Sequence, residues 1–477
     1  MTHVGARPRV AVIGLDCADP KLVFDDWRDA LPNLARLADT GTWGPLRTVD
    51  PPVTVPAWTC MVTSRDPGDL GIYGFRNRAD HGYDSLRLAD SRAVTVDRLW
   101  DVLGQAGKHV VVVGVPPTWP PPPVNGVLVS CFLTPDPRTD AFTHPAALRA
   151  ELEDVVGPYR VDVENYRSDD RDRILAEIYQ MTEQRFAVCR HLLDSRPWDF
   201  FMMVEIGVDR IQHGFWSYFD PSHPQHEPGH RYADVVRTYY QYLDDEIGEL
   251  LERFDEDTTV FVVSDHGAQP MMGAVCVNEW LVQEGYLVLH DYPSGATPLS
   301  QANVDWSRTR AWGEGGHYAR LCLNVKEREP EGVVGPDEYD ELRDELIRRL
   351  EEMAGPDGRP IGTRAHRPEQ LWAQRQGIPP DLVVYFGDLA WRSNGTVGHG
   401  QLFSPGNDTG PDDANHAHHG ICILNGPGVA AERRDDLHIL DVAPTVLRAY
   451  GLAPLDGMKG RAIGGEAAMA AERGVAW

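Results

Sequence analysis

The sequence lacks the features of a membrane or disulfide-rich protein. Its 477 residues contain no apolar segment long enough to cross a membrane, and the first residues contain none that would serve as a signal peptide. The seven cysteines are scattered, and no two have C-x-x-C spacing, so neither a disulfide framework nor a zinc ribbon is indicated. We therefore expect a globular protein of the cytoplasm that is not associated with a membrane.

Basic residues are also scarce. The chain has 45 Lys and Arg against 72 Asp and Glu, a formal net charge of −27. Binding to nucleic acid depends on basic side chains that neutralise phosphates, so this charge argues against a nucleic acid polymer as partner. A small anionic substrate remains compatible with it, because bound metal ions reverse the local potential. The sequence gives no indication of the oligomeric state.

Short continuous apolar runs alternate with helical patterns along most of the chain. The runs at residues 10–13, 200–204 and 260–263 have the length and composition of strands buried on both faces. Helical spacing over residues 170–195 and 231–254 precedes the second and third runs. This alternation predicts an α/β fold, with a largely parallel sheet that is covered by helices on both sides.

Residues 274–370 interrupt this alternation and are interpreted as an inserted cap subdomain. They contain a predicted strand at residues 319–325 and a helix at residues 336–353. We expect the main sheet to resume through residues 381–386 and 421–425. The main domain would then comprise residues 1–273 together with residues 371–477.

Six residues of metal-ligand type stand beside the predicted strands. They are Asp16 after the first strand, Asp209 and His213 after the second, Asp265 and His266 after the third, and His416 shortly before the strand at residues 421–425. Ligand sites of open α/β sheets form outside the carboxyl ends of the strands. Three carboxylates and three imidazoles gathered there would repel one another or stay idle without cations, so the pattern predicts two divalent metal ions.

Each of these signals has a plainer alternative. The spacing of Asp209 and His213 places both on one face of a helical turn, where they form either a metal-binding pair or a solvated pair. The sequence Asp265-His266-Gly267 also suits a polar turn. Residues 415–419 offer three histidines, His416, His418 and His419, of which one or two are expected to be bystanders.

Thr54 is the candidate nucleophile, and it lies just before a predicted short helix at residues 55–64. Unpaired N–H groups at a helix start favour a phosphate beside the hydroxyl. A divalent ion would activate that hydroxyl by lowering its pKa. The alternative is a threonine that only caps the helix.

The order of these residues resembles the alkaline phosphatase superfamily, and more narrowly its type I phosphodiesterase/nucleotide pyrophosphatase branch. The resemblance rests on Asp16, the T-x-P at Thr54, the D-x-x-x-H at Asp209, the D-H-G at Asp265, and His416 before a G-I-x-I-L-x-G-P-G strand. The segments PPVTVPAWTCMVTSRDPGDLGIYGF and VCVNEWLVQEGYL are similar to microbial phosphohydrolases of this superfamily. The resemblance implies a three-layer α/β/α sandwich.

The resemblance also implies how the ligands are shared between two ions. One ion would be held by Asp209, His213 and His416. The other would be held by Asp16, Asp265 and His266, with Thr54 as its reactive ligand. Nitrogen and oxygen ligands suit zinc best, and manganese or iron next. His416 is preferred over its neighbours because it stands four residues before Gly420, as in similar sequences.

The segment that begins at Thr54 departs from the sequences of related enzymes in two ways. Sulfatases and phosphonate monoester hydrolases of the superfamily use a C-x-P-x-R segment, whereas this chain has Thr54-Val55-Pro56-Ala57-Trp58, which argues against a sulfatase. Nucleotide pyrophosphatases commonly carry Asn three residues after the nucleophile, where this chain has Ala57.

The function implied is that of a metal-dependent phosphohydrolase. It would cleave phosphodiester or pyrophosphate bonds of a small molecule, such as a nucleotide, through a phosphothreonine at Thr54. Phosphonate C–P hydrolysis and phosphoryl transfer, which also occur in the superfamily, are the enzymatic alternatives. A metal-stabilised binding protein without turnover is the alternative from another class.

Overall fold

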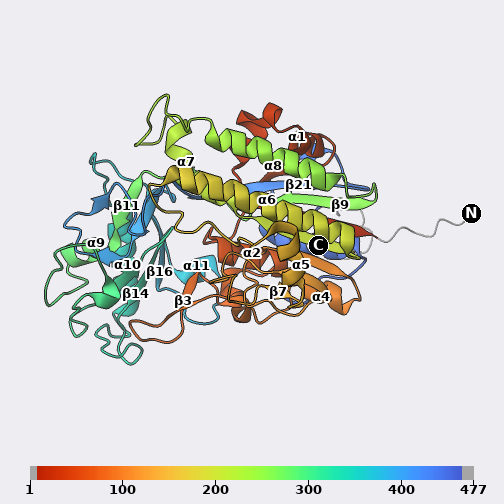
Figure 1. Cartoon of the computed structure of the whole chain (residues 1–477). Helices are drawn as coiled ribbons and strands as arrows, with labels where there is room; N and C mark the ends of the chain where they lie inside the picture. The colour runs from red at the N-terminus through yellow and green to blue at the C-terminus, as the bar shows by residue number, and fades with distance from the viewer. Residues whose placement is uncertain (1–7, 465–477) are drawn as a thin grey trace, which may run out of the picture.

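A ten-stranded sheet forms the centre of the computed structural model, which describes residues 8–464 (Figure 1). The strands follow the order β22, β2, β21, β9, β1, β8, β5, β6, β7, and β23 pairs with β2. Their bounds are β22 (Glu432–Arg433), β2 (Thr42–Arg47), β21 (His419–Asn425), β9 (Thr258–Val263), β1 (Arg9–Leu15), β8 (Phe200–Glu205), β5 (Val110–Val113), β6 (Gly126–Val129), β7 (Thr143–His144) and β23 (Leu437–His438).

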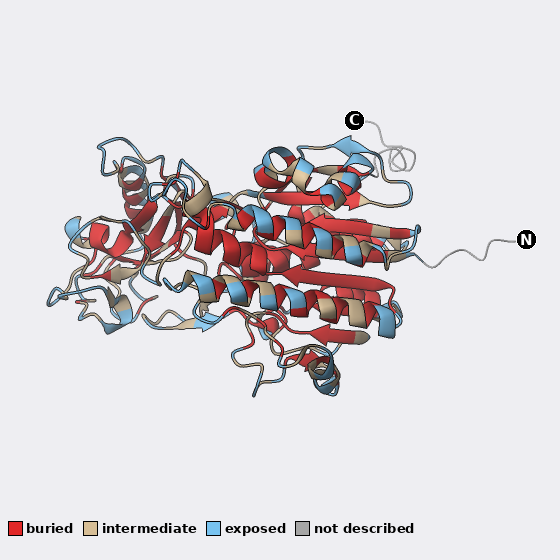
Figure 2. Cartoon of the chain, turned by 45° about the horizontal axis from the view of Figure 1, so that its top comes forward, coloured by how far each residue is buried: buried red, intermediate tan, exposed pale blue. Residues whose placement is uncertain are grey.

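Helices cover both faces of this sheet. Alternate residues of β1 point to opposite sides, so Ala11 and Ile13 belong to one core and Val10 and Val12 to the other. The first core is closed by α1 (Pro32–Asp39), α5 (Leu148–Val156), α6 (Arg171–Ser195), α7 (Gly207–Phe219) and α8 (Val235–Leu251). The core on the opposite face of the same sheet is closed by α2 (Thr54–Thr63), α3 (Pro67–Leu70), α4 (Leu99–Gln105) and α12 (Val442–Ala449). The buried strands between helices are plain in Figure 2, and the predicted α/β/α layering is confirmed.

Strand direction decides where the ends of the strands lie. β1 pairs in parallel with β8 and β9, and β5 pairs in parallel with β8 and β6. β21 runs antiparallel to β9. The residues that precede β21 therefore lie at the same edge of the sheet as the residues that follow β1, β8 and β9. This explains how a histidine placed before a strand reaches aspartates placed after other strands.

A second core lies beside the main sheet, at the left of Figure 1, and contains residues from Val275 to Val397. Its four-stranded sheet has the order β13 (Ala311–Glu314), β14 (Ala319–Leu323), β16 (Leu382–Tyr385) and β15 (Arg364–His366). Its helices are α9 (Val277–Gln283) and α10 (Tyr339–Glu351). The prediction that residues 381–386 return to the main sheet is wrong, because β16 pairs with β14 and β15. The division into two domains stays a prediction.

Smaller sheets and a short helix connect these parts. The paired strands are β10 (Gly267–Pro270) with β20 (Ala414–Ala417), β11 (Gly273–Cys276) with β17 (Trp391–Asn394) and β19 (Phe403–Ser404), β12 (Thr297–Pro298) with β18 (Thr396–Val397), and β3 (Arg76–Arg78) with β4 (Leu86–Leu88). The helix is α11 (Pro368–Leu371). Within residues 8–464 no helix is both long and apolar enough to cross a membrane. The ends of the predicted main domain, residues 1–7 and 465–477, lie outside the described residues.

The central strands should dominate stability. Phe201 on β8 is fully buried in the first core, so Phe201→Ala should lower the free energy of unfolding by about 3–5 kcal/mol, because it removes packed apolar volume. Val155 is 43% exposed, and Val155→Ala should change it by less than about 0.5 kcal/mol. Urea unfolding followed by circular dichroism measures both, and equal effects would contradict this placement of the core.

Candidate metal centre

The edge of the sheet that follows β1, β8 and β9 brings all six predicted ligands together. They form two groups, one with Asp209, His213 and His416 and one with Asp16, Asp265 and His266. Within each group the ligand atoms lie within 4.8 Å of one another, and all six residues are buried. The first group also includes Cys17, which the sequence analysis treated only as one of the scattered cysteines.

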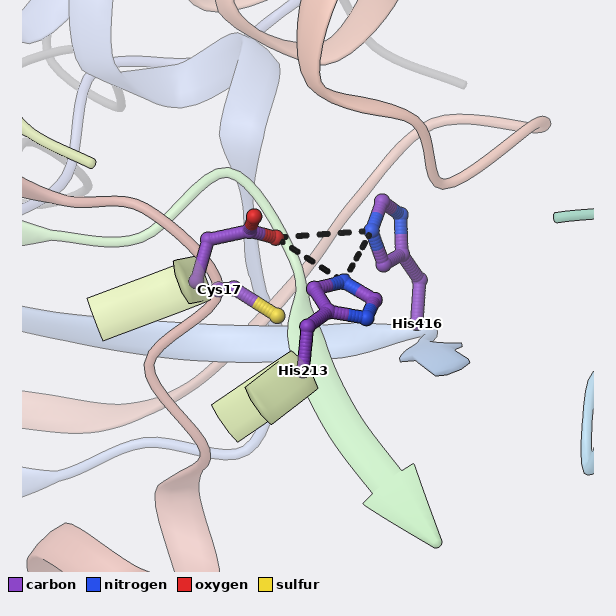
Figure 3. Close-up of side chains that lie close together, drawn as sticks. Cys17, His213 and His416 are labelled. Atoms are coloured by element: carbon purple, nitrogen blue, oxygen red, sulfur yellow. Dashed lines mark hydrogen bonds and ion pairs between the residues drawn. The ribbon is translucent and has the colours of Figure 1, made fainter. Parts of the chain in front are cut away.

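The first group is built from the helix after β8 and the strand before β21 (Figure 3). Asp209 and His213 lie one turn apart on α7, and Nε2 of His213 is 3.1 Å from Oδ1 of Asp209. Nε2 of His416, which comes from β20, is 3.6 Å from the same oxygen and 3.4 Å from Nε2 of His213. The ligand atoms of Asp209, His213 and His416 thus lie close enough together to bind one metal ion.

The second group lies where β1 and β9 end. Nε2 of His266 is 3.1 Å from Oδ2 of Asp265 and 3.9 Å from Oδ1 of Asp16. Those two carboxylate oxygens are buried and accept no hydrogen bond from the described residues. A buried anionic oxygen without a donor is strongly unfavourable, so both oxygens indicate a missing positive partner.

The spacing of the donor atoms suits metal ions. Ligand atoms bound at about 2.0–2.1 Å to one tetrahedral zinc ion lie about 3.3 Å apart. The separations of 3.1, 3.4 and 3.6 Å in the first group are close to that value. Imidazole and carboxylate donors are also the types that zinc accepts. The residues present therefore fit two divalent cations.

Thr54 is the first residue of α2, and its hydroxyl is 3.3 Å from Nε2 of His266. The helix cap is the preceding residue, Val53, and no side chain caps this helix start. The alternative of a threonine that only caps the helix is therefore wrong. Thr54 also lines a cavity of about 510 Å³ together with Asp209, His213 and His416, so its hydroxyl borders both groups.

Burial and charge shift the ionisation of these groups in opposite directions. Burial, together with the charges of Asp265 and Asp209, raises the pKa of Asp16 well above its usual value. Burial opposes the charged form of Asp209 too, yet His213 and Arg210 hold its pKa well below the usual value. Burial and the nearby His266 lower the pKa of His416. His213 and Arg210 thus stabilise the charged form of Asp209, whereas burial and the neighbouring carboxylates disfavour the charged form of Asp16.

Further side chains orient the ligands and were missed by the sequence analysis. Oδ1 of Asp412 is 2.6 Å from Nδ1 of His213, and Arg167 and Arg392 bind its other oxygen. The indole of Trp58 donates to Oδ2 of Asp16 at 2.7 Å. A carboxylate behind a metal-binding histidine fixes the ring and raises its basicity. The Asp412-Asp413 pair shortly before His416 was the available signal in the sequence.

Three further histidines lie near the site. His418 and His419 line a different cavity, whereas His317 contacts a ligand residue. His418 lies 3.4 Å from Asp388 and lines another cavity, which His419 and Tyr385 also line. His317, from the second core's side, stacks on His416 with ring centroids 3.6 Å apart, and its Nδ1 is 2.8 Å from Oδ1 of Asn415. His416 is the member of the His416, His418 and His419 set that joins the metal-ligand group.

The chain matches a known protein family over most of its length. Residues 10–421 match the family described as type I phosphodiesterase / nucleotide pyrophosphatase. The chain belongs to this family. It is therefore a hydrolase of the phosphodiesterase and nucleotide pyrophosphatase type, as the sequence analysis predicted. No curated protein sequence matches the chain significantly.

Solved structures share the fold of this phosphodiesterase-family chain. Human ectonucleotide pyrophosphatase/phosphodiesterase 5 is 14% identical, with a TM-score of 0.55, and the match covers 95% of this chain and 97% of that chain. An inactive form of the murine protein, in complex with AMP, is 13% identical, with a TM-score of 0.53 and coverage of 94% and 96%. At this identity the likeness shows the fold alone.

Asp412 should act on metal affinity through His213. Asp412→Asn removes the charge that orients the ring, so the affinity of the first group for zinc should fall about 10–100-fold. Competition with a fluorescent chelator measures this affinity. The matched control is Asp408→Asn, on the same loop but without contact to a ligand, which should leave zinc affinity unchanged. Unaltered affinity in Asp412→Asn would show that this contact does not support the metal centre.

Proposed function

We propose that this protein is a zinc-dependent phosphohydrolase that cleaves phosphodiester or pyrophosphate bonds of a small phosphate ester such as a nucleotide. The position of Thr54 carries the proposal, because its hydroxyl contacts one ligand group and shares a cavity with the other. One cation would be held by Asp209, His213 and His416, and the other by Asp16, Asp265, His266 and Thr54.

The walls of the cavity support an anionic substrate. Despite the net charge of −27, five arginines line it: Arg76, Arg167, Arg210, Arg320 and Arg392. Three carboxylates, Asp162, Asp209 and Glu314, line the same cavity, so arginines outnumber carboxylates among the side chains that line it. The murine relative in complex with AMP supports a nucleotide-like substrate here. The arginines come from separated segments, which is why no phosphate clamp is evident near Thr54 in the sequence.

The chemistry proposed at Thr54 has two displacements. The hydroxyl oxygen of Thr54 attacks phosphorus and gives its proton to solvent, and the leaving oxygen departs with the electron pair of its bond to phosphorus. Water then attacks the phosphothreonine and gives a proton to solvent, and the Thr54 oxygen departs with its electron pair and takes up a proton. Two divalent cations supply Lewis-acid stabilisation of the charged oxygens and lower the pKa of the hydroxyl. Thr54 lies at the start of α2, where the first N–H groups lack acceptors within the helix and favour a phosphate.

Replacing Thr54 should abolish turnover but should not remove the bound metal ions. Thr54→Ala should lower kcat by more than about 10³-fold, because alanine lacks the oxygen that attacks phosphorus. Thr54→Ser keeps a hydroxyl and should retain a substantial part of the activity. Steady-state kinetics together with metal analysis of each variant tests this. A Thr54→Ala protein that keeps both metals and normal turnover would remove Thr54 from the mechanism.

Metal removal and a substrate pair test the reaction class. Bis(p-nitrophenyl) phosphate should be hydrolysed faster than p-nitrophenyl phosphate, and chelation should abolish both activities until zinc is restored. Product analysis distinguishes a hydrolase from the phosphonate-cleaving and phosphoryl-transfer alternatives, which release a carbonyl product or a new phosphate ester. Full activity in exhaustively chelated protein would contradict the metal requirement.

A further inference from the structure

Cys17 is a member of the first ligand group. Its sulfur is within 4.8 Å of the ligand atoms of Asp209, His213 and His416, and the residue is fully buried. Figure 3 shows this sulfur pointing toward the imidazole of His213. Among the residues that the structure describes, no other cysteine belongs to such a group.

The backbone holds Cys17 in an unfavourable conformation. Its φ is 68°, in the left-handed region that favours glycine. Both of its backbone groups are tied to the metal centre or its supports. The N–H donates to Oδ1 of Asp265 at 3.1 Å, and the carbonyl accepts from the side chain of Gln212 at 2.6 Å. A side chain kept in this region is typical of functional sites, where the surrounding structure overrides local strain.

The plainer interpretation is a small apolar residue. Cys17 does pack with Leu22, Trp216, Ala268 and Ala414, and its sulfur is 3.5 Å from the carbonyl oxygen of Gly267. Packing alone, however, does not account for the three metal-ligand atoms within 4.8 Å of the sulfur. The unpartnered oxygens of Asp16 and Asp265 independently indicate a cation in the second ligand group.

We propose that Cys17, as a thiolate, is a fourth protein ligand of the cation held by Asp209, His213 and His416. The thiol loses its proton to solvent when the cation binds, as metal-binding cysteines do. This inference rests on the metal centre of the proposed function but assigns a ligand that the family resemblance does not imply. A phosphate oxygen would then be a fifth ligand, a number that catalytic zinc sites reach in some transition states.

A sulfur ligand makes the two cation positions chemically unequal. The first position has one sulfur, two nitrogen donors and one carboxylate, whereas the second has only nitrogen and oxygen donors. Thiolate favours zinc over magnesium and manganese. The first position should therefore discriminate against the harder cations more strongly than the second.

Spectroscopy of the full-length protein tests the proposal directly. The probe is Co²⁺, titrated into chelated wild-type protein. The expected result is a sulfur-to-cobalt charge-transfer band in the near ultraviolet. X-ray absorption of the zinc-loaded protein averages over both ions and should therefore show about half a sulfur scatterer per zinc, at about 2.3 Å. These two measurements need no variant, so they decide the matter even if a substitution impairs folding.

Two variants test whether the sulfur that binds cobalt belongs to Cys17. Cys17→Gly suits the left-handed backbone and should fold, still bind Co²⁺, and lose the band completely. Cys422→Ala, which changes another buried cysteine within the main sheet, should keep the band. A wild-type protein that binds two cobalt ions without the band, or a band that persists in Cys17→Gly, would overturn the role of Cys17 and leave the proposed hydrolase intact. A protein that binds no cobalt or zinc at all would contradict both.

Discussion

The proposed site depends on the burial of three carboxylates, Asp16, Asp209 and Asp265, in two ligand groups at one edge of a sheet. Negative charges removed from water are unfavourable unless positive partners satisfy them. Arg210 and His213 provide such partners for Asp209, but Asp16 and Asp265 each keep a buried oxygen that accepts no hydrogen bond from the described residues. Two divalent cations would satisfy this constraint, and the same ions would activate the Thr54 hydroxyl as proposed.

The sheet topology is what makes this concentration of charge possible. β1, β8 and β9 are neighbouring parallel strands, so the residues that follow them share one edge. β21 is antiparallel to β9, and His416 therefore reaches the same edge from the other direction along the chain. Helices on both faces shield the strands from water, and Asp412 and Trp58 fix the orientation of the ligands behind them. The cations would thus occupy a buried site that borders a cavity lined by several arginines.

Much of this could be predicted from the sequence, because buried parallel strands are continuous apolar runs and their ends are marked by Asp16, Asp209 and Asp265. The run at residues 381–386 shows the limit of that reasoning. Its composition is the same as that of a main-sheet strand, but β16 belongs to the second core, and composition alone carries no information about pairing partners. The positions of Asp412, His317 and Cys17 beside the ligand groups depend on contacts between distant segments. The left-handed backbone of Cys17 and the ligand atoms near its sulfur are visible only in the structure.

The central claim is that this chain holds two divalent cations at the places where its buried donors converge. Anomalous diffraction from crystals of the purified protein, measured at the zinc absorption edge, tests this most directly. The account predicts two peaks, one among Asp209, His213 and His416 and one among Asp16, Asp265 and His266. Crystals grown with zinc that show no peak at either position, or a peak only elsewhere, would contradict it.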